Sequence, residues 1–190
     1  MRSIGDNIIV KYEIGHNRNV KIGDVTIEIS RECNIDLKEG NDQKGVVVGV
    51  AEGEQWLKEG DVVFTHYLSS DEGNMFEHDG EKYWRVPRKN VFFRINADET
   101  LETNDGVYLC EQLMLEQPRT ASGIYLTPYD VKEDTLRLKV THKPHDAKGI
   151  DVGDVIMSSD AYQYVLKYNG LEVVKIDYNF ISGIYNGEES

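Results

Sequence analysis

Apolar and polar residues alternate in short runs along most of the chain, and the runs end at glycine, aspartate, asparagine or proline. These runs are rich in β-branched and aromatic residues, a pattern typical of β-strands. No long stretch shows the i, i+3, i+4, i+7 spacing of an amphipathic helix. The pattern therefore predicts an all-β chain, with strands at Asn7–Tyr12, Val25–Ile29, Gly45–Val50, Asp61–Thr65, Lys82–Val86, Val91–Ile95, Gly106–Cys110, Leu136–Thr141, Asp154–Met157, Tyr164–Tyr168, Glu172–Ile176 and Phe180–Tyr185.

The strand pattern occurs twice along the chain. Many short strands at this spacing indicate barrels or sandwiches, and two copies of one barrel explain the repeat most simply. We expect a first domain over residues 1–97 and a second over 98–190, joined within the polar segment 96–103. The aligned stretches are GDNIIVKYE (5–13) with NDGVYLCEQ (104–112), LKEGDVVF (57–64) with IDVGDVIM (150–157), and HDGEKYWRVPRKNVFFRI (78–95) with YNGLEVVKIDYNFISGI (168–184).

Turn residues stand at matching places in the two copies. Gly60-Asp61 and Gly153-Asp154 each lead directly into an apolar strand, which suits a tight turn with glycine at positive φ and aspartate capping the backbone. Asp79-Gly80 and Asn169-Gly170 lie between predicted strands, where a type I′ hairpin turn favours these residue types. These turns are expected to fix the register of the strands.

The net charge of the chain limits the kinds of partner it can bind, and its cysteine content indicates the cellular compartment. The formal net charge is −13 and the pI is near 4.8, so we expect no binding to nucleic acid or to an anionic membrane. The two cysteines, Cys33 and Cys110, form no CxxC pair, which suits a reducing compartment. The first residues lack the apolar core of a signal peptide, and no run has the length of a membrane-spanning helix. We expect a cytoplasmic protein.

The stretch RTASGIYLTPYD, residues 119–130, places Ile124, Tyr125 and Leu126 in a row between a Ser-Gly pair and a proline. The surrounding segment, about 116–134, shows neither the helix nor the strand period, and loops of such length are usually functional or disordered. Two interpretations are open. The triplet either forms a short edge strand with apolar side chains inward, or it belongs to a mobile loop that presents a hydrophobic plug to a partner.

The order of these motifs resembles the co-chaperonin family (GroES-like). That family's barrel opens with a strand of the D-x-V-I-V-K kind, resembled by DNIIVK and more loosely by DGVYLC. A long mobile loop with a Gly-Ile-Val-Leu-like segment follows, then a Gly-Val-Val-type strand and a V-G-D-x-V turn. The second copy has SGIYLTP and VGDVI in that order, and the first has KGVVVGV and EGDVVF. The resemblance covers nearly the whole chain twice and implies two tandem GroES-like β-barrels.

The resemblance also implies how a partner is bound. In the family, the apolar triplet of the loop docks between helices of a chaperonin's apical domain, so Ile124, Tyr125 and Leu126 would be the docking side chains and Gly123 the flexible residue before them. The chain is then expected to bind a chaperonin (GroEL-like) ring and to assist the folding of unfolded client proteins indirectly.

The energy of such docking bears on the oligomeric state. Burial of Ile124 and Leu126 contributes about 1.5–3 kcal/mol each, against about 2–5 kcal/mol for ordering a disordered segment. A single loop therefore binds weakly. Useful affinity requires several loops presented together, so we expect a homo-oligomer.

The first copy differs at the matching place, about 13–44. NVKIGDVTIEI (19–29) reads as two alternating strands around Gly23-Asp24, a hairpin with its own turn. No glycine followed by an apolar triplet stands there. We expect this loop to be remodelled and not to be a chaperonin anchor. The alternative is that Val25 and Ile27 serve as a shifted anchor.

We expect neither an enzyme nor a cofactor. No P-loop, Rossmann fingerprint or G-x-S-x-G elbow occurs, and the scattered carboxylates nominate no acid–base pair. His142 and His145 have near-ligand spacing, but a proline intervenes and no third ligand is placed, so a solvated loop is favoured over a zinc site. A second hypothesis is a non-enzymatic structural or assembly module, derived from a phage or mobile element, that reuses the barrel to bind another partner.

Overall fold

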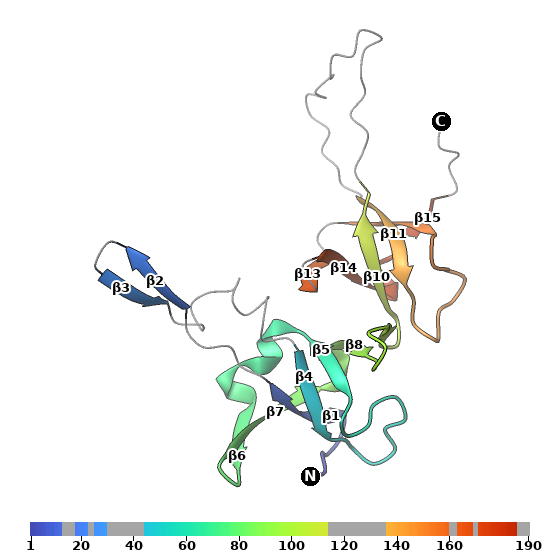
Figure 1. Ribbon diagram of the computed structural model, residues 1–190. Coiled ribbons are helices and arrows are strands. Elements are labelled where there is room, and N and C mark those ends of the chain that lie inside the picture. Colours follow the sequence, from blue (N-terminus) through green and yellow to red (C-terminus); the bar gives the residue numbers. More distant parts are fainter. Residues whose placement is uncertain are drawn as a thin grey trace. The chain divides into compact units, whose positions relative to one another are not determined.

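The computed structural model describes residues 1–12, 18–22, 25–29, 44–113, 136–159, 163–168 and 171–185. In this part of the chain the helices are single 3-10 turns and the other regular elements are β-strands, so the predicted all-β class is confirmed (Figure 1). None of these helices is long and apolar enough to cross a membrane. The strands are β1 (Asn7–Tyr12), β2 (Arg18–Ile22), β3 (Val25–Ile29), β4 (Lys44–Gly49), β5 (Val62–Thr65), β6 (Met75–His78), β7 (Glu81–Pro87), β8 (Val91–Ile95), β9 (Leu101–Thr103), β10 (Val107–Gln112), β11 (Leu136–His142), β12 (Val155–Ser158), β13 (Tyr164–Tyr168), β14 (Leu171–Asp177) and β15 (Gly183–Ile184). The 3-10 turns are η2 (Tyr67–Ser70), η3 (Glu72–Asn74), η4 (Arg88–Asn90) and η6 (Tyr178–Phe180).

The chain divides into two compact units, which we describe separately. The first comprises Met1–Asn104 together with residues 167–170, and the second comprises Asp105–Leu166 and Leu171–Ser190. The segment 96–103, which the sequence suggests as the join, forms a turn and strand β9 inside the first unit. There β9 pairs with β8.

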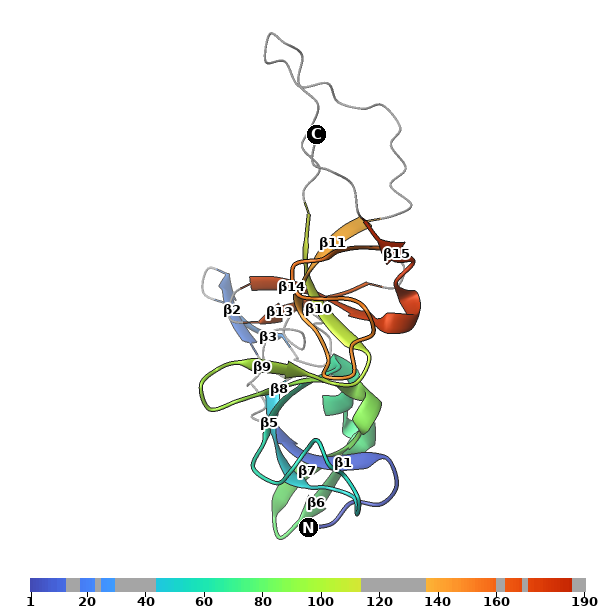
Figure 2. The ribbon, with the colours of Figure 1, turned by 90° about the vertical axis from the view of Figure 1, so that its right-hand side faces the viewer.

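The first unit holds a seven-stranded antiparallel sheet in the order β6-β7-β1-β4-β5-β8-β9. Strand β1 is central, and its Val10 pairs with Trp84 of β7 on one side and with Val47 of β4 on the other. The pairing of β1 with β4 shifts register between Ile9 and Val10, which bends the strand. Figure 2 shows these strands curving around a shared interior.

The second unit holds a six-stranded antiparallel sheet in the order β13-β14-β10-β11-β12-β15. This order repeats that of the first six strands in the first sheet. Strand β10 takes the place of β1: Cys110 pairs with Val174 of β14 and with Val140 of β11, and the register shifts between Leu109 and Cys110. Cys110 is therefore the register equivalent of Val10.

This equivalence corrects the sequence alignment by one residue. Aligning residues 5–13 with 104–112 places Val10 opposite Leu109, whereas the strand pairing places it opposite Cys110. The error arises because the alignment relied on the aspartate before each strand, while the position of the bulge depends on pairing with both neighbours. The other two aligned stretches keep their offsets. Trp84 and Val174 take equivalent pairing positions, and Asp61 and Asp154 form equivalent caps.

Neither sheet closes on itself among the described strands. The edge strands β6 and β9 of the first sheet, and β13 and β15 of the second, each pair with one neighbour. Strands β2 and β3 form a separate two-stranded sheet that pairs Arg18 with Ile29. This hairpin, centred on residues 23–24, confirms the two strands predicted there.

Each sheet covers a hydrophobic core of its own, and register-equivalent positions contribute to both. Ile8 and Tyr108 are equivalent, as are Val86 and Ile176. The first core contains Ile8, Val10, Tyr12, Val47, Leu57, Val63, Trp84, Val86 and Val91. The second contains Tyr108, Cys110, Leu138, Val140, Ile150, Ile156, Val174 and Ile176.

One cross-strand pair is filled in opposite ways by the two units. In the first sheet Tyr12 pairs with Gly45, and in the second Gln112 pairs with Leu138. A Cβ atom at Gly45 would lie 2.4 Å from a methyl of Val10 and 2.8 Å from the Tyr12 ring. In the first unit the large apolar side chain of this pair is therefore Tyr12 of β1. In the second unit it is Leu138 of β11.

The predicted Gly-Asp turns occur in both units. Gly60 and Gly153 have φ angles of +91° and +99°, a region that favours glycine. Asp61 Oδ2 and Asp154 Oδ2 each accept a hydrogen bond from the backbone amide of the residue three positions earlier, at 3.0 and 2.7 Å. The pair Asp79-Gly80 has φ angles of +52° and +77°, as a type I′ hairpin turn requires. The second predicted hairpin pair, 169–170, lies outside the described residues.

Candidate functional site

The predicted partner-binding residues lie outside the described part of the chain; they are Gly123, Ile124, Tyr125 and Leu126. Both ends of the segment that carries them are described. The Leu113 backbone amide, just after β10, donates to the carbonyl of Arg137 in β11 at 3.3 Å. The segment 114–135 therefore leaves and rejoins the second sheet between two paired strands. The stretch between β1 and β4 holds the same place in the first sheet.

The described part of the second unit contains a polar pocket of about 330 Å³. Its walls come from the turn before β10, the β11–β12 connection and η6, and Asp105, Tyr108, Asp146 and Tyr178 are among the lining residues. Gly106, at φ +68°, ties these walls together. Its amide donates to Asp146 Oδ1 at 3.1 Å, and its carbonyl accepts from the Tyr178 amide at 2.7 Å.

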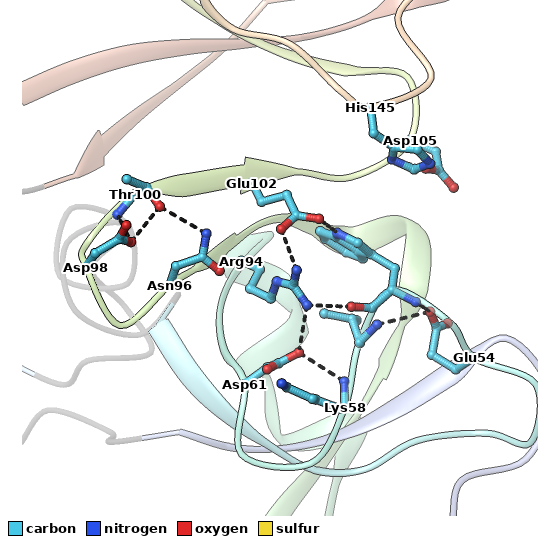
Figure 3. Close-up of polar contacts among 12 residues, drawn as sticks. Glu54, Lys58, Asp61, Arg94, Asn96, Asp98, Thr100, Glu102, Asp105 and His145 are labelled. Carbon is cyan, nitrogen blue, oxygen red and sulfur yellow. Dashed lines mark hydrogen bonds and ion pairs between the residues drawn. The ribbon is translucent and has the colours of Figure 1, made fainter.

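Three polar side chains meet at the rim of this pocket. The ligand atoms of Asp105, His145 and Asp146 all lie within 4.8 Å of one another. His145 Nδ1 lies 3.4 Å from Asp105 Oδ1. Figure 3 draws these two side chains. All three residues are exposed. One imidazole and two carboxylates at this spacing can hold a divalent metal ion.

Tyr108 brings a buried hydroxyl to the same pocket. The residue occupies a core position of β10 and is 0% exposed. Its Oη makes no hydrogen bond of ordinary geometry. Burial raises the pKa of this phenol, the Lys148 backbone opposes that shift, and the Asp146 carboxylate adds to it. Asp146 and Lys148 also line the pocket, so the hydroxyl belongs to its wall.

The second histidine of the THKPH stretch is not part of this group. His142 is half-buried at the end of β11, and burial lowers its pKa. Its Nδ1 lies 3.1 Å from Thr141 Oγ1.

The equivalent place in the first unit is occupied by a network of charged side chains around Trp56. The Arg94 guanidinium donates to the Trp56 carbonyl at 2.7 Å and to Asp61 at 3.3 Å, and it also pairs with Glu102 (Figure 3). Trp56 Nε1 donates to Glu102 at 3.0 Å. These contacts bind the β4–β5 connection to β8 and β9.

Two arginines also lie over the Trp56 ring, with guanidinium carbons 5.4 Å (Arg88) and 6.0 Å (Arg94) from its centre. Arg88 forms an ion pair with Glu54 at 3.0 Å. By strand register, Trp56 corresponds to Gly149, Arg88 to Tyr178 and Glu54 to Ala147. The second unit therefore has none of these three side chains, and Tyr178 together with Asp146 and Lys148 of the β11–β12 connection lines its pocket.

Sequence reasoning missed the carboxylate members of the rim group. The sequence suggests His145 as a ligand only together with His142. Asp105 and Asp146 looked like scattered surface charges, because Asp105 lies far from His145 in the chain. The one available signal was that Asp146 directly follows His145.

No model of a known protein family and no curated protein matches the chain.

Proposed function

We propose that the chain is a co-chaperonin-like protein built as two GroES-like barrels in tandem. It binds a chaperonin ring through Gly123, Ile124, Tyr125 and Leu126 and assists the folding of client proteins, with no enzymatic activity of its own. The anchor would belong to the second unit alone. The motif resemblance and the repeated strand order support this reading.

The observation that carries the proposal is where the segment 114–135 attaches. Its ends meet at the Leu113–Arg137 hydrogen bond between neighbouring strands of the second sheet. The whole apolar triplet therefore lies in the sequence that connects β10 to β11. In the first sheet, the connection at this place holds the β2–β3 hairpin and no comparable triplet. Specialisation of the two units follows from this difference.

A homo-oligomer is supported by the edge strands. In the first unit β9 pairs with β8, joining Glu102 to Arg94. The equivalent of β8 in the second sheet is β15, and no strand pairs with the outer edge of β15 among the described residues. The register equivalents of β9 are residues 1–3, followed by Ile4, whose side chain is 87% exposed. We propose that residues 1–3 of one copy pair with β15 of the next, placing Arg2 opposite Ile184.

Chaperonin binding is tested with a double variant, Ile124→Ser with Leu126→Ser. The full chain is mixed with the host's chaperonin in the presence of nucleotide, and the complex is measured by pull-down and native mass analysis. We expect nucleotide-dependent binding by the wild type and its loss in the double variant, because the docking surface would lose its two aliphatic side chains.

The matched control is the double variant Val25→Ser with Ile27→Ser in the first unit. It removes the same kind of side chain from the connection that lacks the triplet. We expect it to bind like the wild type. If this control variant loses chaperonin binding and the Ile124–Leu126 variant keeps it, the anchor lies in the first unit. Failure of the wild type to bind would contradict the co-chaperonin proposal and favour an assembly module with another partner.

The strand-pairing part has its own test. Arg2→Cys and Ile184→Cys are combined in a chain whose natural cysteines are replaced, Cys33→Ser and Cys110→Val. Adjacent copies paired in this register should form disulfide-linked dimers and longer chains under mild oxidation. A chain that remains monomeric by native mass analysis contradicts head-to-tail pairing and leaves loop docking as a separate question.

A further inference from the structure

The rim of the second unit's pocket has the geometry of a metal site. Ligands bound to one divalent ion at about 2.0–2.4 Å lie no more than about 4.8 Å apart. The ligand atoms of Asp105, His145 and Asp146 meet this limit. Asp146 is also oriented from outside the group, because its Oδ1 accepts the Gly106 amide hydrogen bond. Hydrogen bonds of this kind commonly hold ligating carboxylates in place.

A second feature, independent of these carboxylates, points to a ligand here. Tyr108 is fully buried, yet its hydroxyl makes no hydrogen bond of ordinary geometry among the described residues, although the Lys148 backbone lies close enough to lower its pKa. An unpaired buried hydroxyl costs about 1–3 kcal/mol. Because Tyr108 lines the same pocket as Asp105 and Asp146, a ligand held at the rim can offer the missing partner.

The first unit provides an internal comparison. By register, Asp105, His145 and Asp146 correspond to Gly5, Glu52 and Gly53, and Tyr108 to Ile8. Of these four equivalents Glu52 alone carries a ligating side chain, and it pairs with Arg2. The second unit alone combines a histidine, two carboxylates and an unpaired hydroxyl at this place.

We propose that Asp105, His145 and Asp146 bind one divalent transition-metal ion at the mouth of this pocket, with the Tyr108 hydroxyl as a hydrogen-bond partner for water or another ligand on the ion. The mixed nitrogen and oxygen donors suit Zn²⁺ and Mn²⁺ more than Mg²⁺, which prefers oxygen donors. Three protein ligands leave coordination positions for water, and the pocket of about 330 Å³ has room for it. The site does not depend on the proposed chaperonin function.

Metal binding is measured on the full, untagged chain by calorimetric titration with Zn²⁺ and by electron paramagnetic resonance with Mn²⁺. We expect one ion per chain at this site, with Zn²⁺ bound more tightly than Mn²⁺, as the general order of divalent affinities predicts. His145→Gln should weaken binding by more than about ten-fold, the scale on which metal sites respond to loss of a supporting group. Asp105→Asn combined with Asp146→Asn should abolish it.

The matched control is His78→Gln. His78 Nε2 lies 3.4 Å from Asp79 Oδ2, an exposed His–Asp pair like that of His145 and Asp105, but no third ligand joins it in the described part of the chain. This variant should bind the ion like the wild type. If the wild type binds no ion stoichiometrically, or if His78→Gln and His145→Gln weaken binding equally, the site is wrong and the acidic surface attracts cations without a specific position.

Tyr108→Phe tests the role of the hydroxyl. It removes the unpaired oxygen and keeps the ring, so the core should remain folded. We expect the stoichiometry to stay at one ion, while affinity falls several-fold and the Mn²⁺ spectrum changes because a ligand of the ion loses its hydrogen bond. An unchanged affinity and spectrum would remove Tyr108 from the site.

Discussion

The two units share one strand order and one register, but they differ in how they fill the space beside the connection between the second and third of their common strands, β4–β5 and β11–β12. In the first unit, the β4–β5 connection carries Trp56, which is held by Arg94 and lies against Arg88. In the second, the β11–β12 connection carries Gly149 at the equivalent position, and a pocket opens beside it. Backbone topology can thus be kept while a few side chains decide whether a region is closed or open to ligands.

What the two units keep in common is backbone chemistry. Gly60 and Gly153 both take a positive φ, and Asp61 and Asp154 both cap the turn that follows the connection. A bulge at the same register position bends β1 and β10. Because these features act through main-chain geometry, they tolerate changes in the side chains around them.

The units can be followed separately in solution. The chain has two tryptophans, Trp56 and Trp84, and both belong to the first unit. Tryptophan fluorescence therefore reports the first unit. Cys110 lies in the second core, and burial raises its thiol pKa to about 12. Its alkylation at pH 8, measured in a Cys33→Ser background, therefore reports unfolding of the second unit.

The largest effect is expected from the cross-strand pair that the units fill in opposite ways. Leu138→Ala removes a fully buried side chain from the second core and should destabilise that unit by about 2–5 kcal/mol. Denaturant unfolding followed by Cys110 alkylation measures the loss.

The reciprocal change is Gly45→Ala in the first unit. Its Cβ would lie 2.4 Å from Val10 and 2.8 Å from Tyr12, so overpacking should cost about 1–3 kcal/mol, seen by tryptophan fluorescence. Each variant should leave the other unit's reporter unchanged. If Gly45→Ala is neutral, Tyr12 does not fill the space that we assign to it.

The next effect concerns the network around Trp56. Trp56→Gly introduces the residue that the second unit has at the equivalent position, Gly149. It removes the ring beneath two arginines and the hydrogen bond to Glu102. We expect a loss of about 2–3 kcal/mol, combining the cation–π contacts with one hydrogen bond. Trp84 fluorescence provides the measurement. A loss below about 0.5 kcal/mol would mean that the contacts of the indole with the two arginines and Glu102 contribute little to the stability of the first unit.

Much of this comparison was accessible from the sequence. Strands Asn7–Tyr12, Val91–Ile95 and Tyr164–Tyr168 were predicted to the residue, because β-branched and aromatic residues between turn residues form a local signal. Strand β9 was missed. Its polar sequence, Leu101–Thr103, resembles a linker and becomes a strand because it pairs with β8, a tertiary effect that no local pattern contains.

The candidate metal site was less accessible for the same kind of reason. Asp105 and His145 come together because the turn before β10 and the β11–β12 connection lie side by side. The unpaired hydroxyl of Tyr108 is equally invisible in the sequence, since it depends on what surrounds a core position. Whether Gly123–Leu126 binds a partner stays a prediction, because those residues lie outside the described part of the chain.

A smaller effect is expected from alkaline pH. The folded thiol of Cys110 has a pKa of about 12, above the value of about 8.5 for an exposed thiol. Its stabilising contribution is therefore present below about pH 8.5 and is lost as pH rises, because the unfolded thiol ionises first. Between pH 9 and 10 the second unit should lose about 1 kcal/mol through this thiol.

The matched variant is Cys110→Val, which introduces the residue that the first unit has at the equivalent position, Val10. Denaturant unfolding followed by circular dichroism at pH 9 and pH 10 should show less change in this variant than in the wild type. An equal loss in both would assign the alkaline sensitivity to another group.

The smallest effect should separate the two aspartate caps. Asp154→Ala removes one hydrogen bond, from the Asp151 amide, and should cost about 0.5–1.5 kcal/mol. Asp61→Ala removes the equivalent bond from the Lys58 amide and also the contact with Arg94, so it should cost about 1 kcal/mol more, the scale of a typical hydrogen bond. Each loss is read by the reporter of its own unit. If the two variants lose the same stability, Arg94 is satisfied by Glu102 and Trp56 alone, and the closed network of the first unit depends on the indole and not on the cap.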